Sequence, residues 1–473
     1  MASIRHVLAL VFLFAVAAIS GCQQYHPSPL LPTDVVNAVD RERHPIATQT
    51  NPIADGDHKD AVESSKEVQP LTFVQAAAMM RDHSPELHEV QAAYRTTLAL
   101  ANVKTPLPNP SVTVGPQFGF GPGVLPFNRT QPFGSIGFTL PTNKKFRRQD
   151  ELNRAMADMA QIEYLARHRE LYLELRKDYS RLFVDRTRLV LRKTVADSAA
   201  KSVDLSRKLV ESGQASLLDA GLLQLEYIRF KTDTIGARTD IAGVEGDLSQ
   251  LVGVGSETFQ SLPSNALPEI PAALPSLEDL KAILIANQND LARLRARYDV
   301  AERQLRLEIA KQYPDFRFGP NYMRDPADTK SIIGLSLGID LPVFDRNQQA
   351  VATACQQREE IRAKYEAAAN KSLAKLERSW QIVELTSERM KIVKDELAPK
   401  ANSNLELSIK QLMAGQIDSL RFLETERAQR SAIIDAVEAE LALREAWIDL
   451  EQAVGFPLMK FPDEDARDFQ SEP

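Results

Sequence analysis

The chain is poor in the residues from which metal sites and catalytic centres are usually built. Its 473 residues include two cysteines, Cys22 and Cys355, and seven histidines, all at or before His168. No histidine is spaced with a cysteine or an acid as metal ligands are, and no glycine-rich phosphate loop is present. We therefore expect no catalytic residue, no metal and no cofactor beyond a covalent lipid, so the chain is not predicted to be an enzyme.

An excess of basic residues is also absent. Lysine and arginine total 57 against 64 aspartate and glutamate residues, and the net charge of −7 argues against a nucleic-acid partner. After the N-terminal segment, no apolar run approaches the roughly 18 residues that a membrane-spanning helix requires.

The N-terminus has the pattern of an export signal. Arg5 precedes an apolar run over Val7–Ile19, and small residues follow, which predicts a signal peptide over residues 1–21. The cysteine directly after Ile-Ser-Gly resembles the bacterial lipoprotein box, in which Cys22 becomes the lipidated first residue, with palmitate among its acyl chains. Gln23 stands where an aspartate would resemble an inner-membrane retention signal, so sorting to the outer membrane is favoured. The alternative is an ordinary cleaved signal with an incidental cysteine.

An internal duplication organises the rest of the chain. Four pairs of short motifs recur in the same order at nearly constant spacing, which indicates a repeat. The pairs are Gly137-x-x-Leu140-Pro141 with Gly338-x-x-Leu341-Pro342, Gly213-Gln214 with Gly415-Gln416, Asp247-Leu248…Val252-Gly253 with Asp449-Leu450…Val454-Gly455, and Asn109-Pro110 with Tyr313-Pro314, at offsets of 201, 202, 202 and 204.

The first repeat, residues 71–262, predicts a helix, a β-hairpin and a hairpin of long helices. Thr72 is expected to cap the first helix and Pro85 to interrupt it. Alternating residues predict strands over 111–120 and 133–140. A helical pattern then covers 143–212, Gly213 can end it, and Ser216-x-x-Asp219 resembles a capping box that opens a return helix to about residue 251.

The second repeat, residues 277–460, predicts the same plan. It has one helix over 277–312, strands over 314–322 and 331–341, and long helices over 347–413 and 418–454. Asp345 is the expected N-cap of the first long helix, and Pro399 is expected to kink it. The flanking segments are an extended or disordered tether over 22–70, a proline-rich linker over 263–276 and an acidic tail over 461–473.

The strands are two-faced, with apolar residues on one side and small or polar residues on the other. About ten residues suit a membrane β-strand, and this alternation suits a barrel with lipid outside and water inside. Four strands cannot close a pore, eight would be filled by side chains, and twelve from three chains give the smallest open barrel. Helical patterns of about 70 residues would extend the wall by about 100 Å. A small soluble β-sandwich is the alternative.

The repeated plan, the Gly-Gln hairpin tips and the Asp-Leu-x-x-x-Val-Gly helix ends resemble the TolC family of outer-membrane efflux channels over residues 71–456. Leu107-Pro108-Asn109-Pro110 and the run Leu341–Gln348 are most similar to its heavy-metal, CzcC-type subgroup. The resemblance implies an α+β membrane protein whose four β-strands per chain contribute to a trimeric 12-stranded barrel, and whose α-helical coiled-coil hairpins form a periplasmic tunnel. It also implies a homotrimer in outer-membrane lipid, a periplasmic adaptor (membrane fusion) protein and an inner-membrane pump, usually of the resistance-nodulation-division class.

The resemblance further implies two sets of functional residues at the hairpin tips. A periplasmic gate maps to Asp219 and Glu424, with Arg421 where relatives often have an acid. A ring of three carboxylates at each acidic position would attract cations and resist compaction by like-charge repulsion. Arg421 could instead pair with a carboxylate and hold the entrance shut, and Asp219 could equally serve only in the helix cap. The adaptor-docking tips map to Ser212, Gly213, Gln214, Ala414, Gly415 and Gln416.

We accordingly expect an outer-membrane exit duct of a tripartite efflux system, which passively conducts substrates delivered by the pump, such as heavy-metal cations or drugs. One alternative is the exit duct of a type I secretion system. Another is a non-conducting lipoprotein whose coiled coils brace the envelope. The alternating strands favour a duct, because a brace does not need polar faces on four strands.

Overall fold

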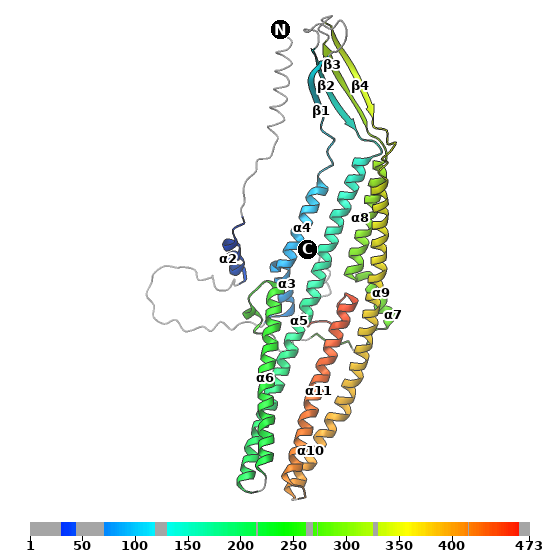
Figure 1. Ribbon diagram of the computed structural model, residues 1–473. Coiled ribbons are helices and arrows are strands. Elements are labelled where there is room, and N and C mark those ends of the chain that lie inside the picture. Colours follow the sequence, from blue (N-terminus) through cyan, green and yellow to red (C-terminus); the bar gives the residue numbers. More distant parts are fainter. Residues whose placement is uncertain are drawn as a thin grey trace, which may run out of the picture. The chain divides into compact units, whose positions relative to one another are not determined.

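The structure is a computed structural model, and the chain divides into two compact units, Met1–Ala61 and Val62–Pro473. Cys22, the residues before it and the tail after residue 462 lie outside the described part of the chain (Figure 1). The described residues are 30–43, 71–118, 130–213, 216–261, 268–271, 273–324, 330–414 and 416–462.

The first unit contains a helix, α2 (Pro32–Arg43), inside the segment expected to be an extended or disordered tether. Proline is favoured in the first turn of a helix because its φ is already helical and its missing N–H is not needed there. Asp34 in the first turn, and Arg41 and Arg43 in the last, also complement the helix dipole. The prediction for 22–70 was therefore wrong over this stretch.

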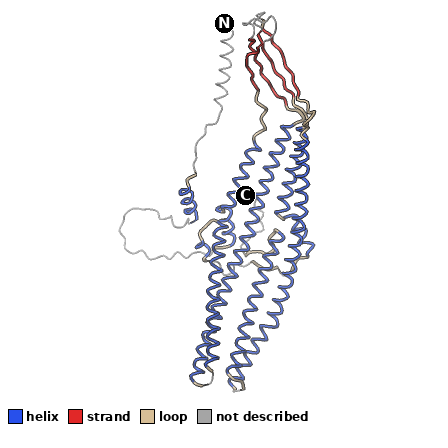
Figure 2. Tube along the Cα trace, in the orientation of Figure 1, coloured by secondary structure: helices blue, strands red, loops and turns tan. Residues whose placement is uncertain are grey.

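The second unit repeats one order of elements twice, as the sequence predicts (Figure 1). The first half contains α3 (Phe73–His83), α4 (Pro85–Asn102), β1 (Ser111–Phe118), β2 (Thr130–Leu140), α5 (Lys145–Glu211), α6 (Leu217–Val252) and the short η3 (Ser256–Phe259). The second contains α7 (Leu277–Asn287), α8 (Asn289–Lys311), β3 (Phe316–Arg324), β4 (Ser331–Ile339), α9 (Gln348–Ile392), η4 (Val393–Leu397), α10 (Ala398–Met413) and α11 (Ser419–Val454). Figure 2 shows the strands gathered at one end of this unit.

Each half begins with a broken helix. Thr72 caps α3 as predicted, with its hydroxyl accepting from Gln75 N at 3.3 Å, and the chain breaks at Ser84 before Pro85. The second half was expected to have one helix over 277–312, but it breaks at Gln288 with φ −65° and ψ 116°, close to the −62° and 119° of Ser84. The break therefore belongs to the repeat and does not need a proline.

Two glycines lie against the two breaks. Gly253 ends α6 with φ +83°, and a Cβ at this position would overlap the carbonyl oxygen of His83. Gly455 ends α11 with φ +76°, and its Cβ position lies 3.4 Å from the carbonyl oxygen of Asn287. The end of each return helix thus packs on the break of its own half, and only glycine adopts this conformation without strain.

The strand-to-helix junctions differ from the expected capping. The residue that precedes α9 is Asn347, with φ 56°, and the carboxylate of Asp345 accepts the backbone N–H of Asn347 at 2.8 Å. Asp345 is therefore not the N-cap residue. The amide of Asn347 instead donates to Glu308 Oε2 at 2.8 Å, which fixes the start of α9 against α8.

The long helix of the second half is irregular where a proline was expected to disturb it. Val393–Leu397 form a π-helical turn, η4, and Pro399 lies in the first turn of α10 directly after it. A π turn inserts one residue into the helical ladder and so accommodates the missing N–H of proline. The first half has no counterpart of this proline, and α5 runs as one helix of 67 residues.

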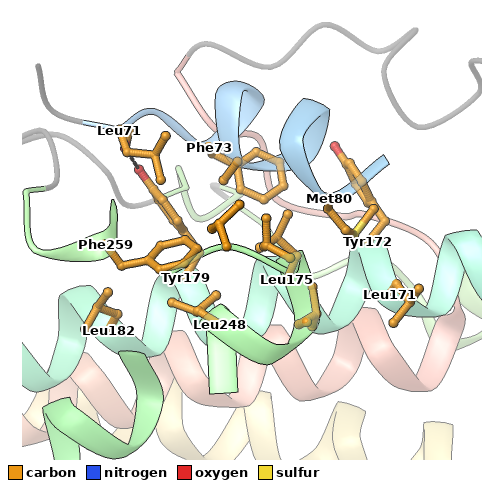
Figure 3. Close-up of a cluster of buried hydrophobic side chains, with 14 of the residues drawn as sticks. Leu71, Phe73, Met80, Leu171, Tyr172, Leu175, Tyr179, Leu182, Leu248 and Phe259 are labelled. Carbon is orange, nitrogen blue, oxygen red and sulfur yellow. Dashed lines mark hydrogen bonds between the residues drawn. The ribbon is translucent and has the colours of Figure 1, made fainter. Parts of the chain in front are cut away.

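A buried core joins the start of α3 to α5, α6 and the end of the described chain (Figure 3). The hydroxyl of Tyr179 donates to the carbonyl of Leu71 at 2.7 Å, across this core. Phe461 is buried and stacks on Phe73, with ring centroids 4.0 Å apart. The predicted boundary of the acidic tail at 461 is therefore too early, because Phe461 belongs to the core.

Candidate functional site

The four strands form one antiparallel sheet in the order β1-β2-β3-β4, and one face of it is apolar. The register places Leu335, Pro320 and Ile136 on this face, together with the residues two positions away along each strand. Ile333, Leu335 and Leu337 are 77–80% exposed, which is unusual for large aliphatic side chains in neighbouring positions. The face that the sequence assigns to lipid is therefore continuous and uncovered in a single chain.

Most of the opposite face is lined by small and polar residues. Cross-strand rows on this face contain Thr113, Ser135, Asn321 and Gly334, then Ser336 and Gly319, and then Thr139, Arg317 and Gly338. At the end nearest the helices, Arg317 forms an ion pair with Asp340. Within the described residues, β1 and β4 each pair with one strand only, so both edges of the sheet are open.

The first hairpin tip is a glycine-terminated turn. The N–H of Ser212 donates to Lys208 O at 3.1 Å, and Gly213, with φ +72°, donates to Val210 O at 3.0 Å. Ser216 precedes α6, and its carbonyl accepts from Ala220 N at 3.3 Å. Gly213 thus ends α5 as predicted. Gln214 and the side chain of Asp219 lie outside the described residues.

The second hairpin tip has the same layout with a different cap. Ala414 donates its N–H to Lys410 O at 3.1 Å, and Gln416 donates to Gln411 O at 2.8 Å. Asp418 precedes α11, and its carboxylate accepts the backbone N–H of Arg421 at 2.9 Å. Asp418 corresponds to Ser216 in the repeat and supplies the cap that the sequence argument did not identify. Gly415 lies outside the described residues.

Two of the three expected gate residues come together near the second tip. Arg421 and Glu424 are exposed and line a groove between α10 and α11, to which Lys400, Asn404 and Gln411 also contribute. The groove therefore carries charges of both signs.

The two hairpins are also linked near their tips by contacts that sequence reasoning missed. Arg427 on α11 donates to Glu226 on α6 at 2.8 Å. Arg430, which is buried, donates to Glu426 at 3.0 Å, and Ser202 on α5 donates to the same carboxylate at 3.2 Å. Only the tertiary fold reveals these partners, because Glu226 and Arg427 are 201 residues apart.

A second link between the halves lies deep in the helical region. Arg176 on α5 and Glu451 on α11 are 1% and 2% exposed, and Arg176 Nη2 lies 3.2 Å from Glu451 Oε1. Arg176 also donates to the carbonyl of Met459 at 2.7 Å, and its guanidinium lies 4.8 Å from the centre of the Phe461 ring. Glu451 accepts the N–H of Met459 at 2.6 Å. This pair therefore fixes the C-terminal segment on the core.

One carboxyl on α5 has a strongly shifted pKa. Burial, and then the nearby charge of Glu174, raise the pKa of Asp178 to about 6, with Asp247 adding to the shift. Because the pKa is higher in the folded chain than in the unfolded chain, this group favours folding at low pH. That contribution is lost as the pH rises through about 6.

In the described part of the chain, no helix is sufficiently long and apolar to span a membrane, and no cluster of three or more potential metal ligands occurs.

Comparison with known proteins relates part of the chain to a described family. Residues 282–456 match the family described as outer membrane efflux protein. The second repeat is therefore similar in sequence to members of this family. The match covers the second repeat from α7 to α11, and the internal duplication extends the same plan to the first repeat.

A curated relative, the cobalt-zinc-cadmium resistance protein CzcC of Cupriavidus metallidurans, is 23% identical over 210 residues. The matched part is 44% of this chain and about half, 49%, of the relative's length. This relative confirms the expected similarity to the CzcC-type subgroup of the TolC family.

Solved structures of two outer-membrane proteins share the fold. The outer-membrane channel OprN is 17% identical, with a TM-score of 0.68 over 81% of this chain and 90% of OprN. VceC from Vibrio cholerae is 16% identical, with a TM-score of 0.65 over 81% of this chain and 96% of VceC. The predicted fold class, an α+β chain with four strands and long helical hairpins, is confirmed.

Proposed function

We propose that this chain is the outer-membrane exit duct of a tripartite efflux system. One observation carries the proposal: a four-stranded sheet with a continuous exposed apolar face, a polar opposite face and two open edges. Such a sheet is stable in a membrane only when its edges pair and its apolar face meets lipid. β1 of one copy and β4 of the next are the strands available for pairing.

Three copies supply the twelve strands that the wall of an open barrel needs. A barrel of eight strands from two copies would be filled by its own side chains, whereas twelve leave a passage. The long helices of each copy would continue this wall as a tunnel in the periplasm. The chain is therefore a homotrimer in this proposal, and its substrates pass through without chemical change.

The partners follow from this arrangement. A passive duct needs a pump in the inner membrane and a periplasmic adaptor between them, and the resemblance to the TolC family implies a pump of the resistance-nodulation-division class. The adaptor would contact the turns around Gly213 and Ala414, which end the two helical hairpins. Cys22 would carry a covalent lipid and anchor the chain in the outer membrane. The relative CzcC is named a cobalt-zinc-cadmium resistance protein, and by analogy we propose that the cargo of this chain includes heavy-metal cations.

The decisive experiment measures assembly and conductance on the same sample. The full chain, purified from outer membranes in detergent, should have the mass of three subunits, and it should form ion-conducting pores in planar lipid bilayers. A stable monomer, or a trimer that never conducts, would contradict the duct and favour the bracing lipoprotein. Mass spectrometry of the mature N-terminus tests the lipid on Cys22 separately.

We further propose that charged side chains around the second tip limit the periplasmic entrance. Arg421 and Glu424 line one groove, so the variant Arg421→Gln/Glu424→Gln removes both charges with little change of volume. The single-channel conductance should increase about two- to fivefold if these charges form pairs across the closed entrance of the assembled duct, because an exposed charge pair contributes up to about 1 kcal/mol. A matched control, Arg362→Gln/Glu366→Gln, removes an exposed pair on α9. Equal conductance of both variants and the wild type would exclude a gate at these side chains.

A further inference from the structure

An apolar row interrupts the polar face of the sheet. Phe133 on β2 is the register partner of Met323 on β3, and Met323 is the partner of Ile332 on β4. These three side chains, here called the apolar row, lie on the same face as Ser135, Asn321 and Gly334, which form the next row. The fourth partner, on β1, is Gly115.

The apolar row is not an extension of the lipid-facing side. Strand residues alternate between faces, and the neighbours Pro132, Tyr322 and Ile333 occupy the apolar face. Ile332 is 46% exposed, and Phe133 and Met323 are half-buried. In a barrel with lipid outside, all three would therefore point into the water-filled passage.

The surroundings make the row distinct from the rest of that face. Four of the five glycines on the polar face, at 137, 319, 334 and 338, lie on the helix side of the row, and Gln117 and Gln131 follow it on the other side. The row is therefore a patch of large apolar side chains between polar rows. A wholly hydrated ion gains nothing from such a patch, whereas a molecule with an exposed apolar part loses water-accessible surface there.

We propose that the apolar row is a contact site for the apolar part of amphiphilic cargo, such as an organic cation, inside the barrel. The inference rests on the proposed function, because it needs the polar face to line the passage. Strands in a barrel tilt by about 35–45°, so the row runs obliquely and three copies form three inclined patches. The aromatic ring of Phe133 adds attraction for a cation next to the apolar surface.

The experiment uses the full chain in planar bilayers and two cations of equal charge, tetramethylammonium and tetrabutylammonium. The concentration that halves the conductance should be about 3- to 10-fold lower for tetrabutylammonium, because it has more apolar surface to bury. The variant Met323→Ser/Ile332→Ser should remove most of this difference. Asn321→Leu extends the row and should increase the difference, whereas Asn321→Ser, its matched control, should leave it unchanged.

Unchanged ratios in both Met323→Ser/Ile332→Ser and Asn321→Leu, in pores that still conduct, would overturn the contact site and leave the duct intact. A wild type that forms no pores would overturn the duct and the contact site together. The two failures are therefore distinguishable. If the double variant does not assemble, the contact site is tested by Asn321→Leu and Asn321→Ser alone. An equal difference between the two cations in these two variants would overturn it.

Discussion

Replacing Arg176 with methionine will destabilise each subunit by about 3–5 kcal/mol at neutral pH, because it leaves Glu451 as a buried charge without its partner. Methionine keeps most of the apolar contact with Phe73 and Phe461, so the loss is mainly electrostatic. Chemical unfolding of the detergent-solubilised protein, followed by circular dichroism, measures the free energy. The helical signal should also be lost at a lower temperature.

The destabilisation should depend on pH with a definite sign. Burial raises the pKa of Glu451, and removal of the guanidinium of Arg176 raises it further. A carboxyl whose pKa is higher in the folded than in the unfolded chain takes up a proton on folding, so it favours folding at low pH. The difference between variant and wild type should therefore be smaller at pH 5 than at pH 8.

Two controls separate this effect from a general loss of packing. The double variant Arg176→Met/Glu451→Gln removes both charges and should recover part of the loss. Arg362→Met breaks the exposed pair with Glu366 on α9, and its stability should not change measurably. If Arg176→Met were no less stable than Arg362→Met at neutral pH, the pair would not hold the C-terminal segment on the core.

The features that the sequence predicts well depend on local patterns. The alternation of apolar and polar residues predicts the strand β4, and Gly213 predicts the end of the helix α5. Each signal lies within a few consecutive residues, and the structure contains both features. The duplication then placed each element of the second half by its counterpart in the first. The helix break at Gln288 was missed because no proline follows it. Aligning the two repeats could have found it, because Gln288 is the counterpart of Ser84.

Contacts between distant residues account for the remaining misses. Arg176 and Glu451 are 275 residues apart, so neither their pairing nor the burial of Phe461 leaves a local signal. The pairing of Arg427 with Glu226 is of the same kind. One local feature was also overlooked: Asp418 caps α11 at the second hairpin tip, and it is the counterpart of Ser216 in the repeat.

The second large effect concerns the orientation of the sheet, and two adjacent positions on β4 test it. Leu335 lies on the apolar face and Ser336 on the polar face, where its hydroxyl donates to the carbonyl of Gly319 at 2.9 Å. An arginine facing lipid near the middle of a membrane costs about 2–4 kcal/mol, and a trimer would contain three such arginines. Leu335→Arg should therefore abolish trimers in the outer-membrane fraction, as measured by gel filtration of detergent extracts.

Ser336→Arg adds the same side chain one residue away and should still allow trimers to form, because its charge would lie in water. Those trimers should conduct, with a shift of selectivity toward anions in planar bilayers that have a salt gradient, since three positive charges would then line the passage. The opposite pattern, with assembly lost in Ser336→Arg and kept in Leu335→Arg, would mean that the polar face meets lipid. Equal loss in both would mean that neither face lines a channel, and the sheet would then have to be buried between protein surfaces.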